Sequence, residues 1–193
     1  AAPSAAPAMP ALDAAIAGGL PLDDTLAAGL RDVDRALAAG AGLTDLLPMV
    51  VEAIFRCSGA SHVLCCLRDA KSDTLSGRFG RGDAVEAMVQ GFHVPLTAGS
   101  TDLFHAVCAR GADTLIADTR VARIAERLPP WYRKLVQPQA RSMLLLPMML
   151  GEKPVALIYA HSQGDRVLAF NDKQMALLRG LRDRAQAALR QSR

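Results

Sequence analysis

The sequence predicts an α/β fold of the α+β kind: an antiparallel sheet with helices on one face and a cover of loops and short helix on the other. Three observations predict it. Short apolar runs joined by turn residues occur twice, at residues 62–80 and 141–161, which is typical of β-hairpins. Apolar residues recur at three- and four-residue spacing near both ends of the chain, as in amphipathic helices. Residues 119–139, broken by the Pro129-Pro130 pair, keep no regular period and indicate the cover.

The first element is a helix within residues 11–42, and an Ala/Pro-rich stretch at residues 1–10 precedes it as a flexible linker. That stretch lacks the basic start and apolar core of a signal peptide. The sequence has no initiator methionine, so we expect the chain to begin inside a longer protein. The helix carries a narrow apolar stripe, and so does the closing helix of residues 171–193. The stripe residues are Leu26, Leu30, Val33 and Leu37 in the first helix and Leu178 and Leu181 in the last.

The elements between these helices follow from turn and cap residues. A second helix leads from Thr44 to Cys57, and residues 43–193 are expected to form the main domain. Strands are expected at residues 62–68, 74–80, 94–97, 114–117, 141–150 and 155–161. Short helices are expected at residues 84–91 and 101–110, with a further helical turn in the cover.

The composition excludes several classes of protein. Half the residues are apolar and 21% are charged, which is the balance of a folded domain. The net charge of +3 comes from interspersed cations and anions, so no nucleic-acid partner is expected. No apolar run reaches the roughly 18 residues needed to cross a bilayer, so we expect a cytoplasmic protein without a membrane partner.

The chain offers no obvious catalytic or metal centre. Its cysteines, Cys57, Cys65, Cys66 and Cys108, lack metal-binding spacing and are expected to be reduced and buried. His93 and His105 are formal axial ligands for haem, but a lone histidine is weak evidence. We therefore expect no catalytic residue, no metal and no cofactor.

Several phrases of the sequence resemble the GAF domain over about residues 43–189. The phrases that carry the resemblance begin at Asp45 (Asp-Leu-Leu-Pro-Met-Val-Val-Glu-Ala-Ile), Ala112 (Ala-Asp-Thr-Leu-Ile-Ala-Asp), Arg141 (Arg-Ser-Met-Leu-Leu-Leu-Pro-Met), Pro154 (Pro-Val-Ala-Leu-Ile-Tyr-Ala-His) and Phe170 (Phe-Asn-Asp-Lys-Gln-Met-Ala-Leu-Leu). The segment of residues 26–68 also resembles the part that follows HDOD output domains in bacterial signalling proteins. The first resemblance implies a sensory or regulatory domain, and the second implies an HDOD domain in the same protein.

The resemblance also implies a small-molecule pocket between the sheet and the cover. By position, the residues that would line it are Phe79, Phe92, Asp118, Trp131, Tyr132 and Ser142. The chain lacks the signature of cyclic-nucleotide-binding members and the reactive cysteine segment of bilin-binding members, so the ligand stays unnamed.

Three functions remain open at this point. The first is a non-catalytic sensor that binds a small molecule, forms a homodimer through the two apolar stripes, or does both. The second is an interaction scaffold that binds no ligand. The third is a thiol-dependent enzyme similar to the free methionine sulfoxide reductases, which is disfavoured because none of the thiols lies in an activating environment.

Overall fold

The computed structural model describes residues 6–97 and 99–191, which fall into two compact units. Unit 1 comprises the chain up to Ser58 and from Phe170 onwards, and unit 2 comprises Gly59–Ala169. The domain boundary expected at residue 43 lies inside unit 1, at the start of its third helix.

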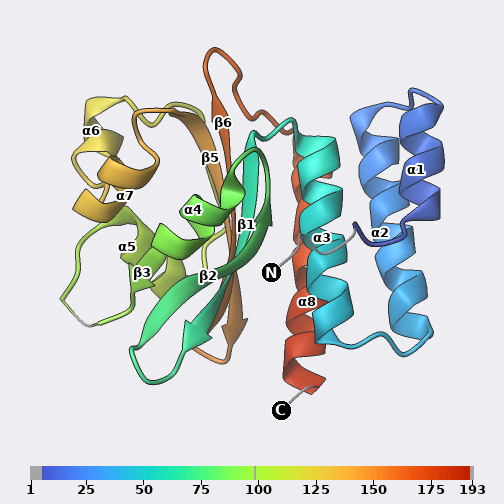
Figure 1. The fold of residues 1–193 in the computed structure, drawn as a ribbon, viewed down its shortest axis with the longest axis horizontal. Coiled ribbons are helices and arrows are strands. Elements are labelled where there is room, and N and C mark those ends of the chain that lie inside the picture. The colour runs from blue at the N-terminus through green and yellow to red at the C-terminus, as the bar shows by residue number, and fades with distance from the viewer. Residues whose placement is uncertain (1–5, 98, 192–193) are drawn as a thin grey trace. The chain divides into compact units, whose positions relative to one another are not determined.

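Unit 1 consists of four helices: α1 (Pro10–Ala17), α2 (Leu22–Ala38), α3 (Leu43–Ser58) and α8 (Asp172–Gln191) (Figure 1). The sequence led us to expect one helix in residues 11–42, and the structure has two. Gly19 takes a left-handed conformation with φ of 63° after α1, and Pro21 immediately precedes α2, so the chain turns between them. The expected linker at residues 1–10 reaches into this unit, because Met9 is buried and Pro10 begins α1; residues 1–5 lie outside the described residues.

A buried carboxylate from α2 caps the first turn of α1. Met9 at the N-cap provides no side-chain acceptor, and Asp32 takes its place. The Asp32 oxygens accept hydrogen bonds from the backbone N–H groups of Ala11 at 3.1 Å and Leu12 at 2.8 Å. Arg35 donates to the same carboxylate at 3.0 Å. A helix of eight residues has little stability alone, so α1 depends on this contact.

Helices α2 and α8 run parallel in unit 1. Asp23 pairs with Lys173 at 3.1 Å, and Asp34 pairs with Arg184 at 2.9 Å. Between these pairs Leu30 lies over Gly180, where an added Cβ atom would sit 3.4 Å from the leucine. The apolar stripe of α2 therefore has a partner helix within the same chain.

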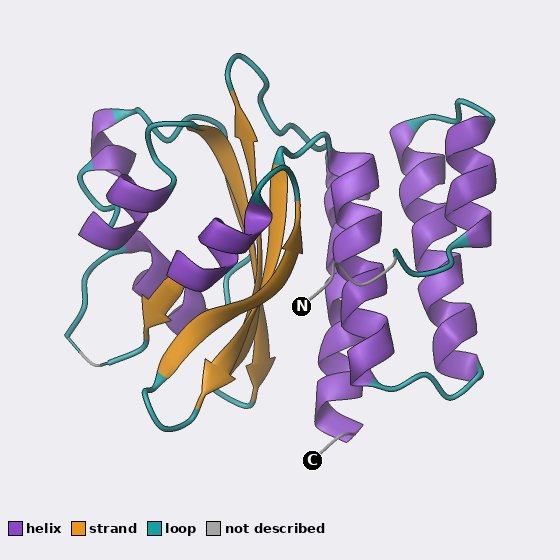
Figure 2. Ribbon diagram, in the orientation of Figure 1, coloured by secondary structure: helices purple, strands orange, loops and turns teal. Residues whose placement is uncertain are grey.

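Unit 2 contains one antiparallel sheet, whose strands are orange in Figure 2. The sheet has six strands in the order β3-β2-β1-β6-β5-β4. The strands are β1 (His62–Asp69), β2 (Thr74–Arg81), β3 (His93–Pro95), β4 (Thr114–Ile116), β5 (Ala140–Leu150) and β6 (Lys153–Gln163). The two expected hairpins are present as β1–β2 and β5–β6, with β1 and β6 at the centre. The helices of this unit are α4 (Val85–Gly91), α5 (Leu103–Arg110), α6 (Ala122–Ala125) and α7 (Pro130–Leu135).

One face of the sheet packs against the helices of unit 2. Leu64 and Cys66 of β1 point to the same side as their partners Tyr159 and Leu157 of β6. This face forms a continuous apolar core with residues of α4, α5 and α7. Among the residues that the structure describes, no helix is long and apolar enough to span a membrane.

Candidate functional site

Five aromatic side chains fill the space between this sheet face and the helices α5 and α7; we call them the aromatic cluster. They are Phe92, Phe104, Trp131, Tyr132 and Tyr159. Four of them are fully buried, and Trp131 is partly buried against them. Short helices and their connecting segments supply all but Tyr159, which comes from the rigid central strand β6.

The rings of the aromatic cluster are in direct contact. Phe92 lies 4.6 Å from Tyr159 and 4.9 Å from Trp131 between ring centroids, and Phe104 lies 4.9 Å from Tyr132. The two tyrosine hydroxyls form a hydrogen bond of 2.8 Å in the buried interior. Burial raises the pKa of both phenols, so both stay protonated near neutral pH. The position expected for a ligand is thus occupied by side chains of the protein.

Three of the six residues expected to line a pocket belong to the aromatic cluster: Phe92, Trp131 and Tyr132. Phe104 and Tyr159 were not among the residues expected to line a pocket. Tyr159 alternates with Leu157 and His161 along β6, and this period of two was the available signal that the three share a face. Phe104 carried no comparable signal, because its inward direction depends on how α5 packs.

Phe79, another of the six residues expected to line a pocket, lies on the opposite face of the sheet from the aromatic cluster. It is the partner of Cys65, whereas the neighbouring Leu64 and Cys66 point toward the cluster. The register of β1 with β2 shifts between Cys65 and Cys66, which marks a β-bulge. No pattern in the sequence predicted this bulge.

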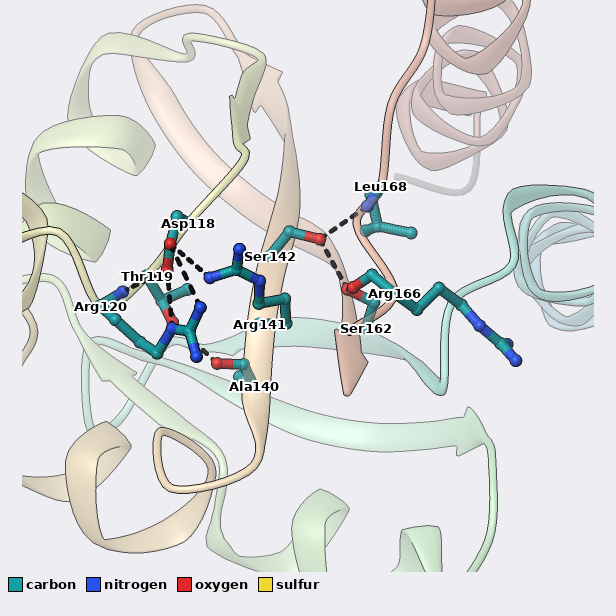
Figure 3. A network of polar contacts seen from close by, with 9 residues as sticks. All are labelled: Asp118, Thr119, Arg120, Ala140, Arg141, Ser142, Ser162, Arg166 and Leu168. Carbon is teal, nitrogen blue, oxygen red and sulfur yellow. Dashed lines mark hydrogen bonds and ion pairs between the residues drawn. The ribbon is translucent and has the colours of Figure 1, made fainter. Parts of the chain in front are cut away.

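Asp118 is also separate from the aromatic cluster and belongs to a polar network at the end of β4 (Figure 3). Its carboxylate accepts the backbone N–H of Arg120 at 2.9 Å and forms ion pairs with the guanidinium groups of Arg120 and Arg141. The Arg120 N–H is the largest cause of a lowered Asp118 pKa, so the group is ionised near neutral pH. Thr119 next to it donates its hydroxyl to the Ala140 carbonyl at 2.8 Å. This network holds the chain after β4 against β5.

Ser142 forms a second set of hydrogen bonds, which Figure 3 shows. It lies on the sheet face away from the aromatic cluster, because its neighbour Met143 points toward that cluster. Its hydroxyl oxygen accepts the backbone N–H of Leu168 at 2.7 Å and lies 2.6 Å from the Ser162 hydroxyl. Ser162 in turn donates to the Arg166 carbonyl at 2.6 Å. These bonds satisfy both buried serines and fix the loop after β6, so the Ser142 hydroxyl is engaged on the face away from Phe92, Trp131 and Tyr132.

Three buried polar atoms have no hydrogen-bond partner among the described residues: Nδ1 of His62, Nδ1 of His161 and Nε1 of Trp131. Such atoms are rare in folded proteins, because a buried polar group without a partner costs free energy. All three come from residues of unit 2, and the Trp131 ring is part of the aromatic cluster. They are the strongest local sign of a binding site.

The two histidines considered as haem ligands, His93 and His105, are not part of the aromatic cluster. His93 is exposed and its Nδ1 lies 3.1 Å from the Ser76 hydroxyl, and His105 is partly exposed on α5. Within the described part of the chain, no group of three or more His, Cys, Asp or Glu side chains could hold a metal ion.

The cysteines are free thiols, with Cys57 partly buried and the other three buried. Burial raises the pKa of Cys65 and of Cys108 to about 12, and it also raises the pKa of Cys66 and Cys57. These thiols are therefore protonated near neutral pH, whereas a nucleophilic cysteine needs a lowered pKa.

The residues expected to form dimer helices are largely buried in the chain itself. Leu26, Val33, Leu178 and Leu181 are each fully buried, and Leu30 and Leu37 are partly buried. The exposed large apolar side chains of unit 1 are instead Ile16 and Leu20, at 38% and 47% exposure.

Comparison with solved structures gives the same fold at low sequence identity. The GAF domain from a Coxiella burnetii phosphoenolpyruvate-protein phosphotransferase has 14% identity and a TM-score of 0.68, over 86% of this chain and 94% of that one. The GAF domain of the corresponding Acinetobacter protein has 16% identity and a TM-score of 0.65, over 85% and 92%. The free methionine-R-sulfoxide reductase of Neisseria meningitidis has 17% identity and a TM-score of 0.62, over 90% and 95%. These likenesses establish the fold.

No curated protein matches the sequence. The family model described as GAF domain matches residues 42–189, from the start of α3 to the last turns of α8. Together with the antiparallel six-stranded sheet, this match shows that the chain belongs to the GAF domain family, a family of sensory and regulatory domains in signalling proteins.

Proposed function

We propose that this domain is a non-catalytic, cytoplasmic sensor whose aromatic cluster responds to a small molecule. The observation that carries the proposal is the coincidence of this cluster with buried polar atoms that have no partner, including Nε1 of Trp131. A ligand that accepts a hydrogen bond from this indole would offset the cost of burying it. Such a ligand has to displace or rearrange rings that are now in contact.

The cover is the part of unit 2 suited to such a rearrangement. Helices α6 and α7 have only four and six residues, and loops flank them on both sides. By contrast, Tyr159 comes from β6, which is paired along its length with β1 and β5. A ligand that moves Trp131 and Tyr132 therefore moves α7 relative to the sheet. It changes the populations of the two positions of α7 only if it binds them with different affinity.

The absence of catalysis is supported by the state of the thiols. Cys66 and Cys108 are the two cysteines of the same core, and the raised pKa of each keeps it protonated. The competing enzymatic function is reduction of free methionine-R-sulfoxide. We expect no turnover of that substrate with dithiothreitol as reductant. Turnover that disappears in Cys108→Ser would overturn the non-catalytic proposal.

A scaffold that binds no ligand is the second candidate, and the close contacts within the aromatic cluster favour it. Native mass spectrometry of the full chain, before and after denaturation, separates the two. A reproducible extra mass that is lost on denaturation supports the sensor. The unmodified mass under both conditions supports the scaffold.

Trp131 provides a second readout, because it is the only tryptophan of the chain. If the retained molecule occupies the aromatic cluster, its removal and re-addition shift the fluorescence of Trp131. The matched control is Phe79→Leu, on the other sheet face, which should leave that shift unchanged. Phe104→Leu, within the cluster, should weaken it. If Phe104→Leu leaves the shift in Trp131 fluorescence unchanged, the retained molecule binds outside the aromatic cluster, which contradicts the proposed site.

Homodimer formation and a neighbouring HDOD domain remain proposals. A dimer built on Leu178 or Leu181 would have to expose side chains that are buried in the chain. We therefore assign a dimer contact to the exposed Ile16 and Leu20 instead. Light scattering of the Ile16→Glu, Leu20→Glu double variant should report half the mass of the unmodified chain, and Val167→Glu is the control. If the unmodified chain, the double variant and Val167→Glu all have the same mass, Ile16 and Leu20 do not form a dimer contact.

A further inference from the structure

Two histidines face one another at one end of the sheet. His62 opens β1, and its register partner is His161 near the end of β6, so both side chains lie on the face that carries the aromatic cluster. Their rings stack with centroids 5.0 Å apart and planes inclined by 18°. Both are buried, with 6% and 0% of their surface exposed, and neither Nδ1 atom has a partner among the described residues.

The partner of His62 fixes where its proton lies. Its Nε2 is 2.7 Å from the carbonyl oxygen of Asp83. A carbonyl oxygen can only accept, so Nε2 must donate and carries the proton. In the neutral ring, Nδ1 of His62 is then an acceptor.

His161 has the opposite arrangement. Its Nε2 lies 3.4 Å from the side-chain nitrogen of Gln163, which also donates to the amide oxygen of Gln139 at 3.0 Å. An amide nitrogen only donates, so Nε2 of His161 accepts and the proton lies on Nδ1. Burial and the neighbouring His62 lower the pKa of His161 to about 3, so this ring is neutral near pH 7.

The stacked pair therefore presents one buried donor and one buried acceptor, each without a partner. We propose that His62 and His161 together bind one hydroxyl oxygen, which accepts from Nδ1 of His161 and donates to Nδ1 of His62. A carbonyl or ether oxygen can only accept and an ammonium group can only donate, so each would leave one histidine unsatisfied. A hydroxyl does both with one atom.

Two sources can supply this oxygen: a trapped water molecule, or the hydroxyl group of a small organic ligand. The second source rests on the proposed sensor function, because it makes the histidine pair the polar anchor of the ligand. Tyr159 connects the two regions, since its ring lies 5.6 Å from that of His161 and 4.6 Å from that of Phe92.

The tautomers are tested first, by long-range ¹H–¹⁵N correlation spectra of the full chain labelled with ¹⁵N-histidine at pH 7.5. We expect His62 protonated on Nε2 and His161 protonated on Nδ1. The more exposed His93 and His105 serve as references in the same spectrum. His161 protonated on Nε2 would remove the donor and overturn the proposal.

The bound oxygen is tested next, through the Nδ1 proton of His161. In a rotating-frame NOE spectrum this proton should show a cross-peak to water. Titration with 2-propanol, with acetone as the matched probe that can only accept, separates the sources. Saturable loss of the water cross-peak with 2-propanol alone identifies a ligand hydroxyl, and persistence of the cross-peak identifies trapped water. Absence of any cross-peak, to water or to alcohol, overturns the proposal.

Two variants of one position complete the test. Asn places an amide near the position of Nδ1, so His161→Asn should retain the effect of the bound oxygen on the Nδ1 signal of His62, whereas His161→Phe should abolish it. Equal His62 signals in the two variants contradict the bridging role. The tautomer experiment uses the unmodified chain, so it stands even if a variant unfolds. A domain that retains no ligand in native mass spectrometry but shows the water cross-peak refutes the sensor and leaves the hydroxyl site intact.

Discussion

Replacing Asp32 should destabilise unit 1 more than replacing any exposed carboxylate of α2. The Asp32 side chain is 1% exposed and accepts two backbone N–H groups at the start of α1, together with Arg35. Loss of a helix cap costs about 1 kcal/mol, and a hydrogen bond to a charged group contributes about 1.5–3 kcal/mol. Because water can reach part of the vacated site, we expect Asp32→Ala to lower the free energy of unfolding by about 3 kcal/mol. Asp32→Asn keeps an acceptor and should cost about half as much.

Urea denaturation followed by circular dichroism measures both losses, and Asp24→Ala is the matched control. Asp24 is an exposed residue on the same helix, so its replacement should change the free energy of unfolding by less than about 0.5 kcal/mol. Amide hydrogen exchange should also show that Ala11 and Leu12 lose protection in Asp32→Ala. If Asp32→Ala and Asp24→Ala unfold at the same urea concentration, the carboxylate does not hold α1 and the reasoning is refuted.

Three further substitutions test the packing and the histidine pair. Gly180→Ala should stabilise by about 0.5–1 kcal/mol, because the helix gains an alanine and the new Cβ meets Leu30 at an ordinary 3.4 Å; a lower urea midpoint would contradict this. Gly77→Ala should lower the free energy of unfolding by about 3 kcal/mol, since its Cβ would lie 2.3 Å from the backbone oxygen of Val89. A loss below about 1 kcal/mol would contradict this and show that α4 can shift away from β2 at little cost. The pKa of His161 is about 3 in the folded protein and 6.5 for the ordinary group. As the pH falls, the unfolded chain therefore binds the proton before the folded protein does, and the free energy of unfolding decreases between pH 6.5 and pH 3. His161→Phe should reduce this loss between pH 7.5 and 4.5, and an unchanged pH dependence would count against a buried neutral ring.

The fold was predictable because its signals are local. Two apolar hairpins, helix caps and the phrase at Arg141 each occupy a few consecutive residues, and the family match confirms the fold that they predict. The break between α1 and α2 was also local, in Gly18, Gly19 and Pro21, but the apolar stripe that follows obscured it.

The candidate site was only partly predictable, because it depends on strand register. Residues 63–67 of β1 are all apolar, so the sequence does not distinguish the two faces of the sheet, and the bulge at Cys65 decides where Phe79 points. His62 and His161 are 99 positions apart, and only the pairing of β1 with β6 brings them together. Ser142 looked like a lining residue until its partner Ser162 on the neighbouring strand was known.

The ion pairs between α2 and α8 have a mechanical consequence. Asp23 with Lys173 and Asp34 with Arg184 are separated by the same number of residues on each helix, eleven, since 34 − 23 and 184 − 173 are equal. A slide of α8 by one helical turn, about 5.4 Å, would separate the partners of both pairs at once. The two pairs therefore favour a single axial register of α8 on α2, and because their groups are partly exposed each contributes only weakly to that choice.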